Sequence, residues 1–196
     1  MMHTIISGIK KLSNENENLL SSFSTFSYEK IKNSELKTIL NSCDIFWFRL
    51  NHNLTENTLK NVRCKYIVCA ATGLDHIDVK YCSKNGIRII SLKGEYDFLQ
   101  NIRATAEHTV LLTLSFLRKT KYIPFHIDKF KWDRTLFCGS ELFEKNIGIY
   151  GMGRIGKLVT QYFLAFGMKV YYFDINENII APKDAIKLDT PELLFS

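Results

Sequence analysis

Three glycines and one aspartate have the types and spacing that most clearly indicate chemistry. Gly151, Gly153 and Gly156 form a G-x-G-x-x-G pattern, and Asp174 stands 18 residues beyond the last of them. In a strand–turn–helix unit, the first glycine permits a tight turn, the second lets the backbone approach a pyrophosphate, and the third allows the helix to pack closely on the strand. The pattern therefore predicts a dinucleotide-binding turn, and a glycine-rich turn without a ligand is the alternative.

The neighbouring segments satisfy the structural context that this pattern requires. The segment "NIGIY" predicts a strand that runs into Gly151, "RIGKLVTQYFLAFG" predicts a helix that Gly167 ends, and "MKVYYF" predicts a second strand. At the start of the helix, near Arg154 and Ile155, free N–H groups and the helix dipole favour phosphate. Asp174 follows the second strand, where its carboxylate can accept both hydroxyls of a ribose.

The charge at this position predicts which dinucleotide binds. A 2′-phosphate would meet the negative charge of Asp174, and the next residues, Ile175, Asn176 and Glu177, offer no cation. The predicted cofactor is therefore NAD rather than NADP.

Strand-like and helix-like segments alternate along the first hundred residues, which predicts a parallel α/β structure. The strand-like segments are "TIISGI", "FSTFSY", "DIFWFRL", "KYIVCAA" and "IRIISL", and the helix-like ones are "KKLSNENENLL", "IKNSELKTILN", "TENTLKN" and "DVKYCSKNG". Next, "NIRATAEHTVLLTLSFLRK" predicts a helix of about five turns, and "TKYIPFHIDKFKWDRTLFCGSE" predicts a loop. Finally, "AIKL" predicts a third strand of the second sheet. "TPELLF" predicts a helix with Thr190 as its cap and Pro191 at its first position.

Composition excludes several classes of function. The net charge is +6, but the 26 Lys and Arg are scattered, so no nucleic-acid partner is predicted. The five cysteines include no C-x-x-C pair, which indicates reduced thiols and a cytoplasmic protein. The longest apolar run, "TVLLTLSFL", is too short for a bilayer, and "KKLSNENEN" near the N-terminus does not fit a signal peptide. We therefore expect no membrane partner.

Two segments together resemble the D-isomer-specific 2-hydroxyacid dehydrogenases, the family of phosphoglycerate dehydrogenase and glyoxylate/hydroxypyruvate reductase. The first segment is "KYIVCAATGLDHIDVKYCSKNGIRIISLKG" with "ATAEHTVLLTLSFLRK", and the second is "ELFEKNIGIYGMGRIGKLVTQYFLAFGMKVYYFD". The pieces between them, Trp132-Asp133-Arg134 and Phe137-Cys138-Gly139, also agree. The resemblance covers Cys43 to Asp174 well and the first forty residues only loosely.

The resemblance implies an α/β protein of two domains. A flavodoxin-like substrate domain would occupy residues 1–99, and the first part of a Rossmann NAD-binding domain would occupy residues 100–196. Backbone N–H groups of Thr72 and Gly73 would hold the carboxylate of a 2-hydroxy or 2-oxo acid, and Thr72 would also approach the nicotinamide. A bare turn would look the same from composition. In the family, the long helix and the following loop often serve dimerisation, so a homodimer is expected.

Two other groups of side chains could suggest chemistry. Asp75, His76 and Asp78 suggest a metal site, but a turn in which Asp78 caps the next helix explains them better, so no metal is predicted. Glu107 and His108 suggest an acid/base dyad, but neighbours on a helix point about 100° apart. In the family, this segment is helix packing.

No catalytic residue is assigned in this sequence. In the family, an Arg orients the substrate, a His is the general acid/base and a Glu tunes that His. All three lie beyond the second strand of the NAD domain, and no segment here matches them. A complete dinucleotide fold also has about six strands, of which three are predicted here. We therefore expect a chain that is truncated at its C-terminus, with "NIGIY" left at a sheet edge.

Three hypotheses follow about function. The chain could be a shortened form of a dehydrogenase, whose activity belongs to the longer protein. It could be a non-catalytic module that binds NAD or another protein. It could also be one half of an assembly in which a second chain supplies the Arg, Glu and His. We favour the first, and the sequence does not name the acid that is the substrate.

Overall fold

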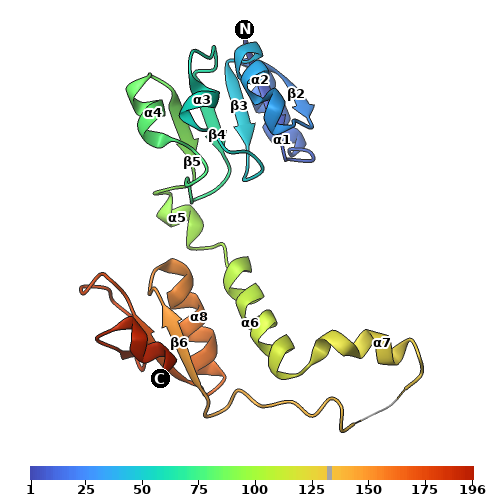
Figure 1. Ribbon diagram of the computed structural model, residues 1–196, viewed down its shortest axis with the longest axis vertical. Coiled ribbons are helices and arrows are strands. Elements are labelled where there is room, and N and C mark those ends of the chain that lie inside the picture. Colours follow the sequence, from blue (N-terminus) through green and yellow to red (C-terminus); the bar gives the residue numbers. More distant parts are fainter. Residues whose placement is uncertain (132–133) are drawn as a thin grey trace. The chain divides into compact units, whose positions relative to one another are not determined.

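The computed structural model describes residues 1–131 and 134–196, and it divides into two units, Met1–Leu99 and Gln100–Ser196 (Figure 1). The division falls at the position that the sequence suggested for a domain boundary. Trp132 and Asp133, which form part of the resemblance, lie outside the described residues.

The first unit is built on a sheet of five parallel strands. Its order is β2-β1-β3-β4-β5, the flavodoxin-like order, in which the chain changes direction across the sheet between β1 and β3. The strands are β1 (Met2–Ser7), β2 (Ser24–Glu29), β3 (Ile45–Phe48), β4 (Tyr66–Cys69) and β5 (Arg88–Ser91). The predicted fold class is confirmed for this unit.

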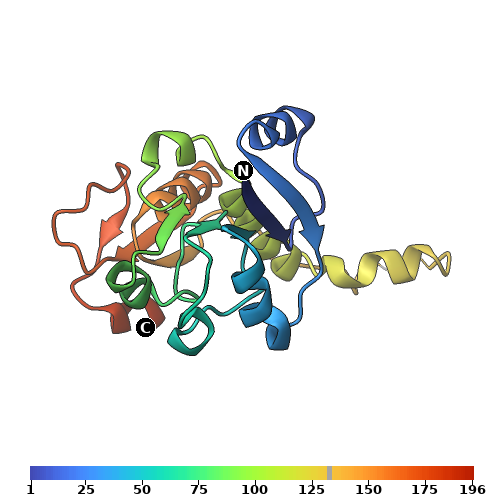
Figure 2. The same cartoon turned by 90° about the horizontal axis from the view of Figure 1, so that it is seen from above.

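Helices cover the two faces of this sheet unequally (Figure 2). The helical segments are α1 (Asn14–Ser21), η1 (Asn33–Glu35), α2 (Leu36–Ser42), α3 (Glu56–Leu59), α4 (Val79–Lys84) and α5 (Tyr96–Leu99). Leu40 of α2, Leu59 of α3 and Cys82 of α4 join the buried core around Phe46 and Phe48, whose rings stack with centroids 5.2 Å apart. Leu20 of α1 lies on the opposite face, beside an apolar hollow of about 320 Å³.

The ends of α4 show how local sequence sets a helix boundary. The Asp78 carboxylate accepts a hydrogen bond from the Tyr81 N–H at 2.9 Å, which satisfies a donor that the first turn leaves free. At the other end, Gly86 has φ +70°, and the Ile87 N–H donates to the Cys82 carbonyl at 3.0 Å. Glycine adopts this left-handed conformation without the steric cost of a side chain. The predicted capping role of Asp78 is confirmed.

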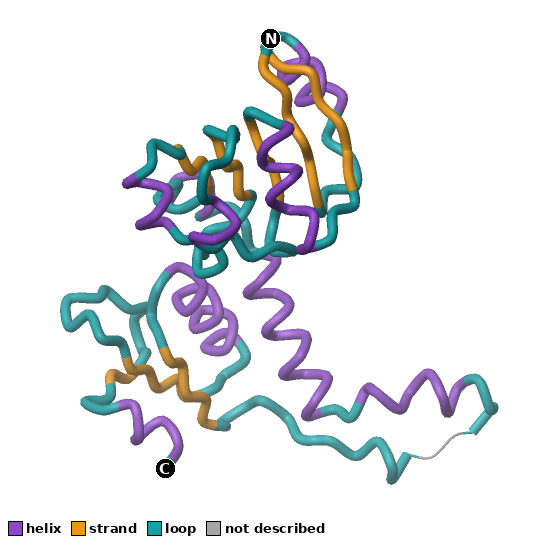
Figure 3. Tube along the Cα trace, turned by 45° about the horizontal axis from the view of Figure 1, so that its top comes forward, coloured by secondary structure: helices purple, strands orange, loops and turns teal. Residues whose placement is uncertain are grey.

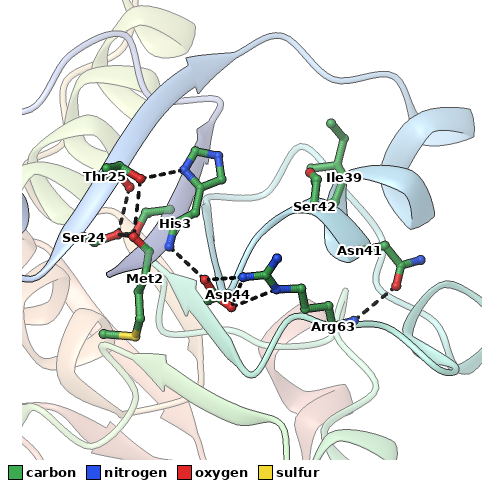
Figure 4. A network of polar contacts seen from close by, with 10 residues as sticks. Met2, His3, Ser24, Thr25, Ile39, Asn41, Ser42, Asp44 and Arg63 are labelled. Carbon is green, nitrogen blue, oxygen red and sulfur yellow. Dashed lines mark hydrogen bonds and ion pairs between the residues drawn. The ribbon is translucent and has the colours of Figure 1, made fainter.

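A polar network centred on Asp44 joins the starts of three strands of the first unit (Figure 4). Its carboxylate accepts from the His3 N–H at 2.9 Å, and the Arg63 guanidinium donates to both carboxylate oxygens at 2.9 and 3.0 Å. The His3 N–H and then the Arg63 side chain hold the pKa of Asp44 below its ordinary value. The network fixes the starts of β1, β3 and β4 against one another.

The second unit contains a sheet of three parallel strands in the order β6-β7-β8. Its elements are α6 (Ala104–Leu117), η2 (Thr120–Tyr122), α7 (Ile123–Ile127), β6 (Asn146–Tyr150), α8 (Arg154–Ala165), β7 (Lys169–Phe173), β8 (Ile186–Lys187) and η3 (Pro191–Phe195). Val159 and Phe163 of α8 are buried with Ala106 of α6 and Val170 of β7. This core holds α6 and α8 against the sheet.

Three details of the second unit differ from the sequence predictions. Helix α6 has 14 residues, about four turns instead of five. The segment predicted as a loop begins with η2 and α7 (Figure 3). Pro124 is compatible with α7 because it lies in the first turn, where its missing N–H costs nothing. The Thr190 side chain makes no capping hydrogen bond, and η3 is a 3₁₀ helix.

Strand β6 lies at an edge of its sheet. Among the described residues, β7 is its one strand neighbour, so the predicted edge position of "NIGIY" is confirmed. An edge that has no strand partner can serve as a template for pairing with another chain. No helix in the described part of the chain combines the length and apolar character that crossing a membrane requires.

Candidate dinucleotide-binding site

The turn between β6 and α8 has the backbone shape that a glycine motif provides. Gly151 has φ +94°, a conformation that residues with a Cβ rarely adopt. Its N–H donates to the Phe173 carbonyl at 2.8 Å, which ties the turn to the end of β7. Gly153 is the N-cap of α8, so the N–H groups of the first helical turn point away from the helix toward solvent.

Gly156 and Gly153 have different surroundings. A Cβ on Gly156 would overlap the Gly151 carbonyl oxygen, whereas nothing lies within 4 Å of a Cβ on Gly153. Position 156 therefore needs glycine for packing, whereas position 153 leaves open space beside the backbone. Within the described part of the chain, the N–H groups of Gly153 and Ile155 donate to no protein acceptor. The geometry suits an anion held by backbone N–H groups.

Asp174 stands at the end of β7, beside this turn. One carboxylate oxygen accepts from the Met152 N–H at 2.6 Å, and the other accepts from the Asn176 N–H at 2.8 Å. These hydrogen bonds, Asn176 first and Met152 second, hold the pKa of Asp174 below its ordinary value, and Lys187 and Lys157 add to the effect. The group is therefore ionised at neutral pH, and each oxygen keeps one lone pair for a further donor.

Arg154 was expected to contribute a backbone N–H group at the start of the helix, and its side chain also makes a hydrogen bond. Its Nη1 donates to the Ile102 carbonyl at 2.8 Å, which connects the turn to the residues just before α6. Ile155 is half-buried and packs against the core of the second unit. The predicted roles of both residues toward a cofactor stay predictions.

Three side chains near the turn were missed by the sequence reasoning. Met152 is fully buried, and the hydroxyl of the equally buried Thr160 donates to its sulfur at 3.6 Å. A threonine on the apolar face of a predicted helix was the available signal. Lys187 comes from β8 and acts on the charge of Asp174, so a cation is nearby, although residues 175–177 supply none. Only the pairing of β7 with β8 reveals it.

Thr72 and Gly73 lie in the first unit, in the turn after β4. Both are exposed, and among the described residues neither N–H group donates to a protein acceptor. The residue before them is fixed at both of its backbone groups, because the Ala71 N–H donates to the Cys69 carbonyl at 2.7 Å and the Ala71 carbonyl accepts from the Leu92 N–H at 3.1 Å. Free N–H groups next to a fixed residue can bind a carboxylate, and this role stays a prediction.

The Asp75–Asp78 turn and the Glu107–His108 pair lie in different units of the chain. Among residues 1–131 and 134–196, no three His, Cys, Asp or Glu side chains are arranged to hold a metal ion. Glu107 and His108 are both exposed on α6, and Ala106 is the member of that segment that is buried. The packing role expected of the segment therefore falls to Ala106.

A buried histidine occupies the point where strand order changes in the first unit. His52 is 3% exposed, and its Nδ1 and Nε2 lie 3.1 Å from Asn33 Oδ1 and 2.9 Å from Ser7 Oγ. The Asn51 Nδ2 is 2.7 Å from Nε2. These contacts hold the loop after β3 against the end of β1. Burial lowers the pKa of His52, so the ring is neutral at pH 7.

Acidification is expected to destabilise the first unit through His52. Because the pKa is lower in the folded than in the unfolded state, the unfolded chain binds more protons, and stability is lost as pH falls below about 6.5. Urea unfolding at pH 7.5 and pH 5.5 measures the loss. The His52→Gln variant, which cannot titrate there, should lose less stability over the same interval. Equal losses in the two proteins would contradict a role for His52.

The fold and the turn define a dinucleotide-binding α/β protein, and comparison with known proteins places it more closely. Residues 110–195 match the model of the "D-isomer specific 2-hydroxyacid dehydrogenase, NAD binding domain". The D-3-phosphoglycerate dehydrogenase of Bacillus subtilis is 34% identical over 136 residues, which are 69% of this chain and 25% of the relative. The hydroxypyruvate reductase of Thermotoga maritima is 29% identical over 164 residues, 83% of this chain and 52% of the relative.

A solved structure agrees at the level of the fold. The NAD-dependent formate dehydrogenase of Staphylococcus aureus, in complex with NAD, superposes with a TM-score of 0.80 at 21% identity, over 100% of this chain and 62% of that one. Residues 110–195 therefore match the NAD-binding domain of the D-isomer specific 2-hydroxyacid dehydrogenases, and NAD is the cofactor of the domain that they match. The chain spans from a quarter to about half of the length of these two curated relatives.

Proposed function

We propose that the second unit binds NAD and that the chain forms part of an NAD-dependent dehydrogenase acting on a 2-hydroxy or 2-oxo acid. The observation that carries the proposal is the pairing of the open glycine turn with the ionised Asp174 at the end of β7. The similarity to proteins named D-3-phosphoglycerate dehydrogenase and hydroxypyruvate reductase supports this class of reaction.

Each residue has a defined part in this proposal. The N–H groups of Gly153 and Ile155 hold the pyrophosphate, and the free lone pairs of Asp174 accept the hydroxyls of the adenosine ribose. The charge of Asp174 disfavours a 2′-phosphate. Thr72 and Gly73 hold the substrate carboxylate through their N–H groups. NAD, when bound, supplies the hydride acceptor or donor for the carbon that carries the substrate oxygen.

We further propose that turnover requires residues from outside this chain, because none of its segments matches the Arg, His and Glu of the family. Two alternatives are a non-catalytic module that binds NAD or a protein, and an assembly with a second chain that supplies these residues. The proposed activity and substrate class belong to the protein that contains all of them, in the cytoplasm.

The 196-residue chain is expected to bind NAD weakly and to oxidise no NADH with glyoxylate or hydroxypyruvate. Weak binding is expected because the chain offers only the phosphate and adenosine-ribose half of the site. Titration of the ¹⁵N-labelled chain with NAD, followed by amide shifts, measures affinity, and absorbance at the NADH band measures turnover. A micromolar dissociation constant for a monomer would contradict the first expectation. Measurable NADH oxidation would contradict the second.

We also propose that the chain associates through α6. Leu111 and Leu112 are each 57% exposed and Phe116 is 83% exposed, so the helix presents apolar side chains to solvent. A dimer by light scattering is the expected result, and Leu112→Glu combined with Phe116→Glu should convert it to a monomer. A monodisperse monomer of the unaltered chain would refute both this proposal and the template role of the β6 edge.

A further inference from the structure

The Asp174 carboxylate holds the glycine turn while it faces the ribose position. We infer that Asp174 is a positioning residue of the phosphate-binding turn as well as an acceptor for ribose, so that one carboxylate couples recognition of the two groups. The inference deepens the NAD-binding function proposed above and rests on it. It is carried by the 2.6 Å hydrogen bond from the Met152 N–H to Asp174 Oδ2.

Met152 is held from two sides. Asp174 binds its N–H, while its side chain is completely buried and its sulfur accepts from the Thr160 hydroxyl at 3.6 Å. Because the Met152 N–H is already engaged, it does not contact phosphate directly. It sets the direction of the N–H groups that follow, those of Gly153 and Ile155.

The flanking glycines explain why such a clamp is needed. Gly151 and Gly153 lie on either side of Met152, and glycine loses more conformational freedom on ordering than any other residue. A turn that is held in its binding conformation before the ligand arrives avoids that loss during binding. Removing the Asp174 carboxylate should therefore loosen the turn and weaken phosphate binding.

Holding the turn does not prevent Asp174 from binding ribose. The Met152 N–H uses one oxygen and the Asn176 N–H uses the other, and each carboxylate oxygen has a second lone pair. A ribose diol can take these two positions without breaking either bond. The two roles of the carboxylate are therefore compatible in one complex.

The test compares two nucleotides that differ only in the ribose hydroxyls. The ¹⁵N-labelled 196-residue chain and its Asp174→Ala variant are titrated with ADP and with 2′,3′-dideoxy-ADP. A residue that only accepts ribose hydroxyls cannot affect the dideoxy compound through contact, and loss of its negative charge would strengthen phosphate binding. A positioning residue predicts the opposite sign, a loss of at least about threefold in affinity for 2′,3′-dideoxy-ADP.

A second readout needs no nucleotide. In Asp174→Ala, the Met152 amide proton should shift upfield and exchange with solvent at least about tenfold faster, which corresponds to about 1.4 kcal/mol. Glu177→Gln, which removes an exposed charge from the same loop, is the matched control and should leave Met152 unchanged. Asp174→Asn keeps the side-chain shape and replaces the alanine variant if that variant does not fold. Its Met152 amide should exchange at a rate between those of the unaltered chain and a chain without the side chain.

The outcomes separate the inference from the function on which it rests. Unchanged or tighter binding of 2′,3′-dideoxy-ADP by Asp174→Ala, or an unchanged Met152 amide, would overturn the positioning role. If the unaltered chain binds neither ADP nor NAD, the proposed function fails, and the Met152 amide still decides whether Asp174 holds the turn.

Discussion

Replacing Gly156 with alanine is expected to destabilise the second unit by about 2 kcal/mol or more. The new Cβ would overlap the Gly151 carbonyl oxygen and crowd the Gly151 carbonyl carbon. Overpacking against backbone, which cannot move aside as a flexible side chain can, should cost about 3 kcal/mol or more, the upper end of the usual range. Alanine gains about 1 kcal/mol over glycine within a helix, which offsets only part of that cost.

Thermal unfolding followed by circular dichroism measures this effect. For a unit of about 100 residues, a loss of 2 kcal/mol lowers the melting temperature by about 8–16 °C. The melting temperature of the first unit should not change, because Gly156 belongs to the second unit. An unchanged or raised melting temperature for Gly156→Ala would show that helix α8 can move away from β6 at little cost.

Replacing Gly153 with alanine should have the opposite combination of effects, an intact fold with impaired binding. The backbone at this position has φ −70°, which alanine adopts without strain, and its Cβ would meet no protein atom within 4 Å. The stability of the unit should change by less than about 1 kcal/mol. The Cβ would instead occupy the space through which the pyrophosphate approaches the backbone, so affinity for NAD should fall at least about tenfold.

The two glycine variants control for each other. The amide spectrum of Gly153→Ala should match that of the unaltered chain outside the turn, whereas NAD should no longer shift the N–H signals of residues 153–155. A Gly153→Ala chain that binds NAD as well as the unaltered chain would place the pyrophosphate elsewhere. That result would remove the glycine turn from the proposed site while leaving the fold assignment intact.

Much of the architecture was predictable from local pattern. The alternation of short apolar runs with helical segments in residues 1–99 predicts parallel strands joined by helices, and the observed sheet has that form. The cap at Asp78 was also predictable, since it depends on residues three apart in sequence. The segment after α6 was mispredicted as a loop, because η2 and α7 are too short to show a helical period.

The glycine turn itself was predictable from the sequence, because the G-x-G-x-x-G pattern and Asp174 act through backbone conformation and strand ends, which are local properties. The sequence did not determine which groups meet at that turn. Met152 bonds to Asp174 across 22 residues, and Lys187 approaches only because β8 pairs with β7. The order of the five strands and the burial of His52 between Ser7 and Asn33 likewise depend on packing between distant segments. Such contacts leave no regular spacing in the sequence, so tertiary structure alone decided them.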